Sequence, residues 1–195
     1  MGVQNVTRVL ITPVSTLPPT SVPNFSRVIQ DQTNWCWAAC TVMVMNRYNL
    51  GPRRQCELAS NLFNPNNKTC CAEPASSLCN QGCDPSLIAS VYQSEGISAT
   101  RRLIPSPISD IDKQTLLSMI RQEIQAGRPV ELKFTISMTA SHAVIISAFM
   151  DAGAEGFRYM ISDPLHTPGC VTGERLIILD GKGIVTDSWT GIKPL

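Results

Sequence analysis

A cysteine flanked by two tryptophans begins an unusual apolar segment of the sequence. In "NWCWAAC", Trp35 and Trp37 bracket Cys36, and Cys40 follows one helical turn later. Such a cysteine could be a buried structural thiol, half of a disulfide, a metal ligand or the nucleophile of an enzyme. Nucleophilic catalysis by cysteine needs a thiolate, an imidazole within hydrogen-bonding reach and a third group that orients the imidazole.

The search for an imidazole is short, because the sequence contains only two histidines. His142 begins the apolar segment "HAVIISAFM", which is typical of a strand, whereas His166 lies in the loop segment "DPLHTPG". Asp163, in "MISDP", ends the next predicted strand, and adjacent antiparallel strands would bring it close to His142. We therefore expect Cys36, His142 and Asp163 to form a catalytic group. His166 is the alternative base, since its loop could fold over the site.

The segment around Cys36 is predicted to be a buried helix. Residues 34–49 contain no Gly or Pro, and apolar side chains would cover nearly every side of the helix. Asn34 is the predicted N-cap, which places Cys36 in the first turn. In that turn the unpaired backbone N–H groups and the helix dipole stabilise a thiolate. Cys40, one turn further along the helix, fits the role of a buried structural thiol better than Cys36 does.

The remaining elements indicate helices first and a largely antiparallel sheet afterwards. This order is typical of an α+β fold. Helices are expected near residues 84–96 and 112–125, and strands near residues 130–137, 142–150, 157–163 and 175–180. Residues 1–24 are rich in proline, so we expect an extended arm or a removable leader, with a short strand near residues 9–11.

Three motifs, "QDQTNWCWAAC", "SHAVIISAF" and "YMISDP", together resemble the bacterial branch of the papain-like cysteine peptidases. That branch includes staphopain-like enzymes, the peptidase domains that trim bacteriocin leaders, and secreted effector proteases of plant pathogens. The resemblance implies a papain-like α+β fold, in which a helical half packs against an antiparallel β half and the active site lies in the cleft between them. Residues 25–195 would form a single catalytic domain, with the helical half at about 30–125 and the β half at 126–195.

The resemblance also implies roles for individual residues. Cys36 matches the nucleophile, His142 the general base, and Asp163 the residue that orients the imidazole. Gln30, six residues before Cys36, matches the glutamine whose amide helps to form the oxyanion hole with the backbone N–H of Cys36. Gln32 is a competitor for that role, but its spacing fits less well. The implied activity is hydrolysis of peptide bonds through an acyl-enzyme intermediate, without a cofactor or a metal.

Two other classes of function remain open at this point. The same Cys–His scaffold could act as a deamidase, a transglutaminase or a peptidoglycan amidase. A non-enzymatic alternative is a disulfide-stabilised toxin or binding module whose catalytic group is vestigial. The intact set of Gln30, Cys36, His142 and Asp163 favours an enzyme that acts on a protein or peptide substrate.

Eight cysteines are many for a protein that is kept in a reducing compartment. If Cys36 is catalytic and Cys40 is buried and reduced, three disulfides could form among Cys56, Cys70, Cys71, Cys79, Cys83 and Cys170, or Cys170 could be left free. The adjacent Cys70 and Cys71 are expected to pair with different partners. The alternative is a zinc site that uses the Cys79–Cys83 spacing.

The overall composition excludes some classes of partner. The net charge is +1 and no basic cluster exceeds a pair of arginines, so we expect no binding of nucleic acid. No apolar run reaches the length of a membrane-spanning helix, so we expect no association with a membrane. We also expect a monomer. The N-terminal segment lacks the apolar core of a signal peptide. Secretion is therefore expected after removal of a signal or by another route.

Overall fold

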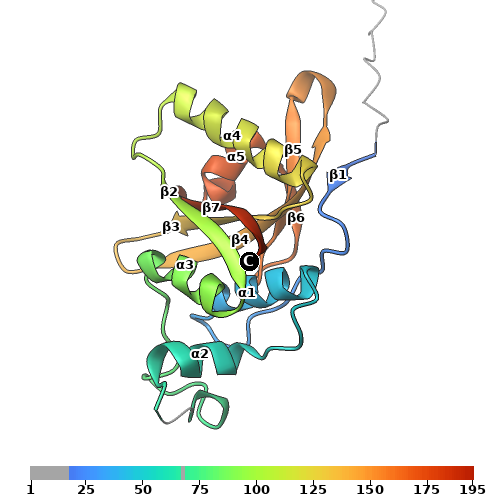
Figure 1. Ribbon diagram of the computed structural model, residues 1–195. Coiled ribbons are helices and arrows are strands. Elements are labelled where there is room, and N and C mark those ends of the chain that lie inside the picture. Colours follow the sequence, from blue (N-terminus) through green and yellow to red (C-terminus); the bar gives the residue numbers. More distant parts are fainter. Residues whose placement is uncertain (1–17, 67–68) are drawn as a thin grey trace, which may run out of the picture.

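A computed structural model describes residues 18–66 and 69–195 (Figure 1). The helices are α1 (Cys36–Arg47), α2 (Gln55–Phe63), α3 (Pro85–Ser94), α4 (Asp110–Gln125) and α5 (Gly173–Ile177). The strands are β1 (Thr20–Ser21), β2 (Ile97–Leu103), β3 (Val130–Thr135), β4 (Ser141–Asp151), β5 (Phe157–Ser162), β6 (Gly169–Thr172) and β7 (Ile184–Pro194). The strand predicted near residues 9–11, with most of the predicted arm, lies outside the described residues.

The seven strands of the described chain form one sheet in the order β2-β7-β3-β4-β5-β6, and β1 pairs with β4. Every pairing is antiparallel. The β3–β4 register runs from Val130↔Ile146 to Thr135↔Ser141. His142 therefore lies opposite Phe134, at the end of the sheet where β3 finishes and β4 begins. Helices and an antiparallel sheet therefore confirm the predicted α+β class.

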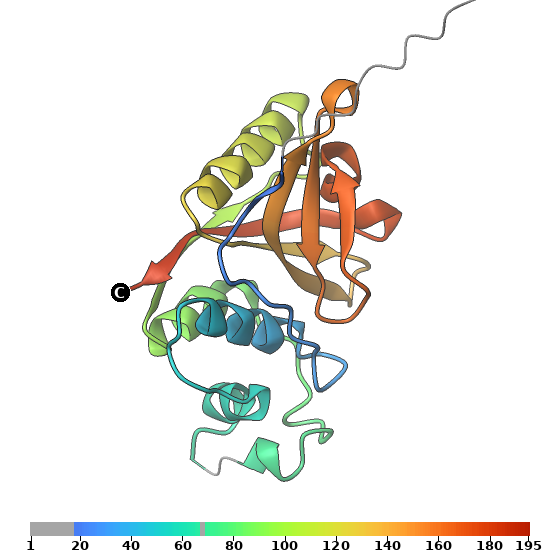
Figure 2. The same cartoon turned by 90° about the vertical axis from the view of Figure 1, so that its right-hand side faces the viewer.

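Helices cover both faces of the sheet. Successive side chains of a strand point to opposite faces, so one strand can contribute to the apolar core on each side. Ala143 and Ile145 of β4 belong to the apolar cluster formed with α1, α2 and α3. Val144 and Ile146 belong to a second cluster, formed with α4 and α5. In Figure 2, α1, α2 and α3 lie below the sheet, while α4 lies beside it. We call α1–α3 the helical half, and the sheet with α4 and α5 the sheet half.

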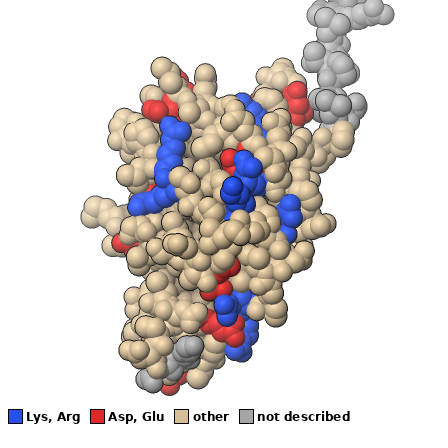
Figure 3. All heavy atoms as spheres, viewed as in Figure 1, with Lys and Arg blue, Asp and Glu red and all other residues tan. Residues whose placement is uncertain are grey.

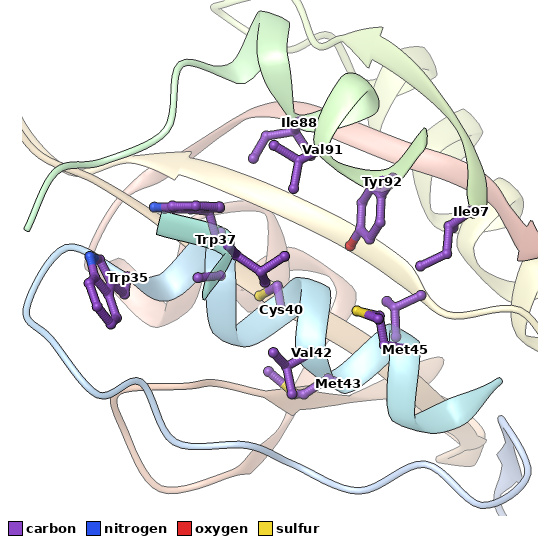
Figure 4. Close-up of a cluster of buried hydrophobic side chains, with 14 of the residues drawn as sticks. Trp35, Trp37, Cys40, Val42, Met43, Met45, Ile88, Val91, Tyr92 and Ile97 are labelled. Atoms are coloured by element: carbon purple, nitrogen blue, oxygen red, sulfur yellow. The ribbon is translucent and has the colours of Figure 1, made fainter. Parts of the chain in front are cut away.

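The central helix α1 is buried along most of its length, as its apolar pattern predicted. Every residue from Trp37 to Met45 is buried. Figure 4 shows Cys40 and Met45 on the side of α1 that faces Val91 and Tyr92 of α3. Burial raises the pKa of the Cys40 thiol well above its ordinary value, which fits a structural role for this cysteine.

The predicted cap of α1 was wrong. Trp35 occupies the N-cap position and makes no capping hydrogen bond with its side chain. The indole N–H of Trp35 instead donates to the carbonyl of Cys79 at 2.8 Å, and Asn34 Nδ2 donates to the carbonyl of Asn80 at 2.8 Å. Both side chains therefore hold the 79–80 turn against the start of the helix, and the first turn of α1 is left without a side-chain cap.

Two further expectations differ from the structure. Residues 175–180 were predicted to be a strand, but α5 ends at Ile177 and a short 3-10 helix follows. Leu176 and Ile177 reach the core from one helical turn, and a short apolar run does not distinguish a strand from a buried helix.

Strand β2 and helix α4 fall within the range 30–125 expected to form the helical half, yet β2 pairs with β7 and α4 packs on the sheet.

Two disulfides, rather than three, connect cysteines in the loop-rich segment. Cys56 is bonded to Cys71, and Cys70 is bonded to Cys79, so the adjacent cysteines do pair with different partners. Cys83 and Cys170 are both free. Because Cys79 is bonded to Cys70, the zinc site that we considered for the Cys79–Cys83 spacing does not form.

The surface carries few charges on the face shown in Figure 3, and basic side chains there lie among acidic ones. Several form ion pairs, such as Arg101–Asp187 at 2.7 Å and Arg53–Glu95 at 2.8 Å. Among the helices that the structure describes, none has the length and apolar character needed to cross a membrane.

Candidate active site

A cleft of about 380 Å³ brings together residues from both halves of the molecule. Its walls come from the start of α1, the loop before α3, strand β3, the start of β4 and the loop after β5. Cys36, His142, His166, Glu131 and Trp189 are among the residues that line it. The cleft is therefore the place where the predicted nucleophile and both histidines meet.

Cys36 is the first residue of α1, and its free thiol is half-buried in the cleft. The backbone N–H groups of a first helical turn have no partner within the helix, so they point toward any negative charge placed there. The side chain of Cys36 shares the cleft with the ring of His142 and is among the groups that raise the pKa of His142. The sulfur between the two tryptophans therefore lies against an imidazole and is not part of a disulfide.

One ring nitrogen of His142 faces a carboxylate. His142 Nε2 lies 2.7 Å from Asp163 Oδ1, and both side chains are buried. Burial acts to lower the pKa of His142, but hydrogen bonds with Asp163 and Cys36 outweigh it and raise that pKa to about 9. For Asp163, burial acts to raise the pKa, and the hydrogen bond and charge of His142 shift it well below its ordinary value instead. Asp163 is thus a carboxylate that accepts from a charged imidazole.

The loop after β5 holds Asp163 in place and adds a second histidine. The backbone N–H groups of Leu165 and His166 donate to Asp163 Oδ1 at 2.8 and 3.0 Å. His166 Nδ1 lies 3.1 Å from Asp163 Oδ2, so the carboxylate lies between two imidazoles. The guanidinium of Arg27 donates to the carbonyls of Asp163 and His166. The sequence indicated His166 only as an alternative base, and no motif in it indicated Arg27.

Gln30, the predicted oxyanion residue, is buried beside the start of α1, with both amide protons in use. Its Nε2 donates to the carbonyl of Gln32 at 2.7 Å and to that of Thr33 at 2.9 Å, while Oε1 has no partner. Its backbone N–H donates to the carbonyl of Pro164 at 3.0 Å, which ties the segment to the Asp163 loop. An oxyanion in the cleft could receive a hydrogen bond from Gln30 only if Nε2 releases one of the two carbonyls.

A profile of the Peptidase_C39 like family matches residues 21–175, a range that includes Gln30, Cys36, His142 and Asp163. The chain belongs to this family. It is therefore a papain-like cysteine peptidase, as the three sequence motifs indicated. No curated protein sequence matches the chain.

Solved structures of two peptidases share the fold of this member of the Peptidase_C39 like family. One is a double glycine motif protease from an AMS/PCAT transporter in complex with the leader peptide. It matches with a TM-score of 0.53 and 13% identity over 91% of this chain and 98% of that chain. The other is the peptidase domain of Streptococcus ComA, a bifunctional ABC transporter involved in quorum sensing. It matches with a TM-score of 0.56 and 14% identity over 88% of this chain and 99% of that chain. These likenesses confirm the papain-like fold.

One acidic residue of this C39-like peptidase has an environment that the sequence did not indicate. Glu131 of β3 lines the cleft, yet its side chain is fully buried. Its Oε2 accepts from the hydroxyl of Tyr92 at 2.5 Å, while Oε1 has no partner. Burial raises the pKa of Glu131 to about 8, and the hydrogen bond from Tyr92 offsets only part of that effect. Glu131 is therefore an uncharged acid at neutral pH.

Proposed function

We propose that the chain hydrolyses peptide bonds with Cys36 as nucleophile, His142 as general base and acid, and Asp163 as the group that orients His142. The observation that carries this proposal is the continuous line of contacts from the thiol to the imidazole and on to the carboxylate. An imidazole placed between a thiol and a carboxylate is the arrangement that nucleophilic cysteine catalysis requires.

In the first step the Cys36 thiolate attacks the carbonyl carbon of the scissile bond, and His142 holds the proton as an imidazolium. Asp163 stabilises that cation, which is consistent with the raised pKa of His142. His142 then donates its proton to the leaving amine, which leaves an acyl group on the sulfur. Water, deprotonated by His142, attacks the acyl group and restores the thiol.

The test of the nucleophile is the rate at which each free thiol reacts with iodoacetamide, followed by peptide mass spectrometry. Cys36 should react fastest, because it is accessible in the cleft and contacts His142. Cys40 is buried, and burial raises the pKa of Cys83 to about 12, so both should react slowly. Cys170 is an exposed internal reference. Modification of Cys36 no faster than Cys170 would refute its activation.

The oxyanion hole is proposed to consist of the backbone N–H of Cys36 and the side-chain amide of Gln30. We expect Gln30→Ala to lower kcat by about 10²-fold, the usual effect of losing one such donor. Because Gln30 also braces the 32–33 turn, unfolding should be measured beside the kinetics. Gln32→Ala is the matched control, since Gln32 contributes its backbone carbonyl. An equal loss of kcat in both variants would contradict the proposed role of Gln30.

The substrate class is proposed to be a protein or peptide, in keeping with the leader peptide bound by the AMS/PCAT protease. Incubation with casein, a peptide library and purified cell wall would identify the reaction, because a peptidase alone creates new N-termini in protein. We also propose that residues 25–195 act as one monomeric catalytic domain. The two disulfides support a secreted location, where such bonds persist.

A further inference from the structure

The mechanism above uses one histidine, but Asp163 contacts two. One ligand atom each from His142, Asp163 and His166 lies within 4.8 Å of the other two. Asp163 Oδ1 is 2.7 Å from His142 Nε2, and Asp163 Oδ2 is 3.1 Å from His166 Nδ1. The two imidazole rings meet edge to face, with centroids 5.8 Å apart. Nothing in the proposed hydrolysis requires the second ring.

This set of donor atoms is one that binds zinc. Two imidazole nitrogens and a carboxylate oxygen are common zinc ligands, and a fourth position is then left for water or another group. His142 and Asp163 are buried, but the side chain of His166 is 47% exposed. His166 also lines both the cleft and a smaller pocket of about 90 Å³ beside Asp163. An ion could therefore reach the site from solvent through contact with His166.

Some charges around the site favour the binding of a cation and others oppose it. Asp163 is ionised, which favours a cation. Arg27 and Lys182 are two positive side chains that oppose the ion, and the ion must also displace the proton between His142 Nε2 and Asp163. We therefore expect reversible binding rather than permanent occupancy.

We propose that His142, Asp163 and His166 bind Zn²⁺ and that this binding inhibits the peptidase. The inhibition rests on the proposed role of His142, whereas the binding rests on the geometry alone. Zinc forms a bond to His142 Nε2 and releases the proton that Nε2 shares with Asp163 to solvent. The ring then retains only its proton on Nδ1. Donating that proton to the leaving amine would produce an imidazolate, so the amine does not leave and the acyl-enzyme does not form.

Binding is tested by titrating Zn²⁺ into Cys36→Ala protein in a calorimeter, which removes the adjacent thiolate as a ligand. We expect a binding event that is at least about tenfold weaker in Cys36→Ala/His166→Asn, since loss of even an outer-shell partner costs a metal site that much. Cys36→Ala/Thr167→Ala is the matched control, because Thr167 lines the same pocket without a ligand nitrogen. Equal affinity with and without His166, or no binding once Cys36 is removed, would overturn the site.

Inhibition is tested separately, by the zinc concentration that halves cleavage of a peptide substrate. Each variant is compared with its own rate in EDTA, and His166→Asn should need at least about tenfold more zinc than the wild-type chain. Zinc binding at His166 without any loss of cleavage would overturn the inhibitory step. A chain that binds zinc through His166 but never cleaves peptide would contradict the proposed function and leave the metal site supported.

Discussion

Replacement of Cys36 by alanine is expected to abolish peptide cleavage, with kcat/KM lowered by about 10⁴-fold or more. Removing the nucleophile from such a catalytic group lowers the rate by roughly that factor. The rate acceleration that remains comes from substrate binding and stabilisation of the oxyanion. The fold should survive, because Cys36 is half-buried at the start of α1 and is not part of a disulfide. Steady-state kinetics on a fluorogenic peptide, with circular dichroism as a check of folding, would measure both effects.

The matched control for that experiment is Cys170→Ser. Cys170 is also a free cysteine, but it is exposed on β6 and does not line the cleft. Its replacement should leave kcat/KM within about twofold, since surface substitutions away from special features have small effects. If Cys36→Ala kept most of the activity, a different residue would have to supply the nucleophile, and the proposed mechanism would be wrong.

The second large effect concerns Glu131. Its pKa is raised from an ordinary value of 4.5 to about 8, because the side chain is fully buried. The folded chain therefore keeps a proton on Glu131 that the unfolded chain releases. Between pH 4.5 and about 8, unfolding releases this proton, so the free energy of unfolding falls as the pH rises. Above about pH 8 the contribution stays constant at its most destabilising value.

We expect Glu131→Gln to be more stable than the wild-type chain at pH 9, by about 2–4 kcal/mol, because glutamine never carries the buried charge. Urea unfolding at pH 5 and pH 9 would measure the effect, which should be much smaller at pH 5. Glu123→Gln is the control of opposite sign, since the hydrogen bond from Arg128 lowers the pKa of Glu123. A Glu131→Gln variant destabilised equally at both pH values would contradict this account.

The sequence predicted the elements that carry strong patterns. The segment that begins at Asn34 is apolar nearly all round, and the structure forms α1 there and buries every residue from Trp37 to Met45. The alternation in "VELKF" predicted β3, and the continuous apolar run in "HAVII" predicted β4, which is buried on both faces. Strand β7 was missed, since Thr186, Asp187 and Gly191 interrupt its apolar residues. Its pairing with β2 and β3 holds it in the sheet, and a single sequence does not show such long-range pairing.

The candidate site could be predicted only in part, for a similar reason. Cys36, His142 and Asp163 could be predicted as site residues because each lies where an element begins or ends, in a recognisable motif. Glu131 was not, since the alternation of β3 places Glu131 and Lys133 on one face that would be taken for a solvent face. The helix α3 covers Glu131, while Lys133 stays partly exposed in the cleft. That difference depends on packing between distant segments.

The disulfides impose conflicting redox requirements on the molecule. Both lie between residues 56 and 79, within the helical half, and neither crosses the cleft. A reagent added to protect the thiol of Cys36 from oxidation also attacks these two bonds. The same reductant would therefore keep Cys36 active and weaken the segment that the disulfides stabilise. The enzyme is favoured by conditions in which both disulfides have formed but Cys36 is oxidised only slowly. No disulfide joins the helical half to the sheet half, so the apolar core that α1–α3 share with β4 and β7 holds the two walls of the cleft together.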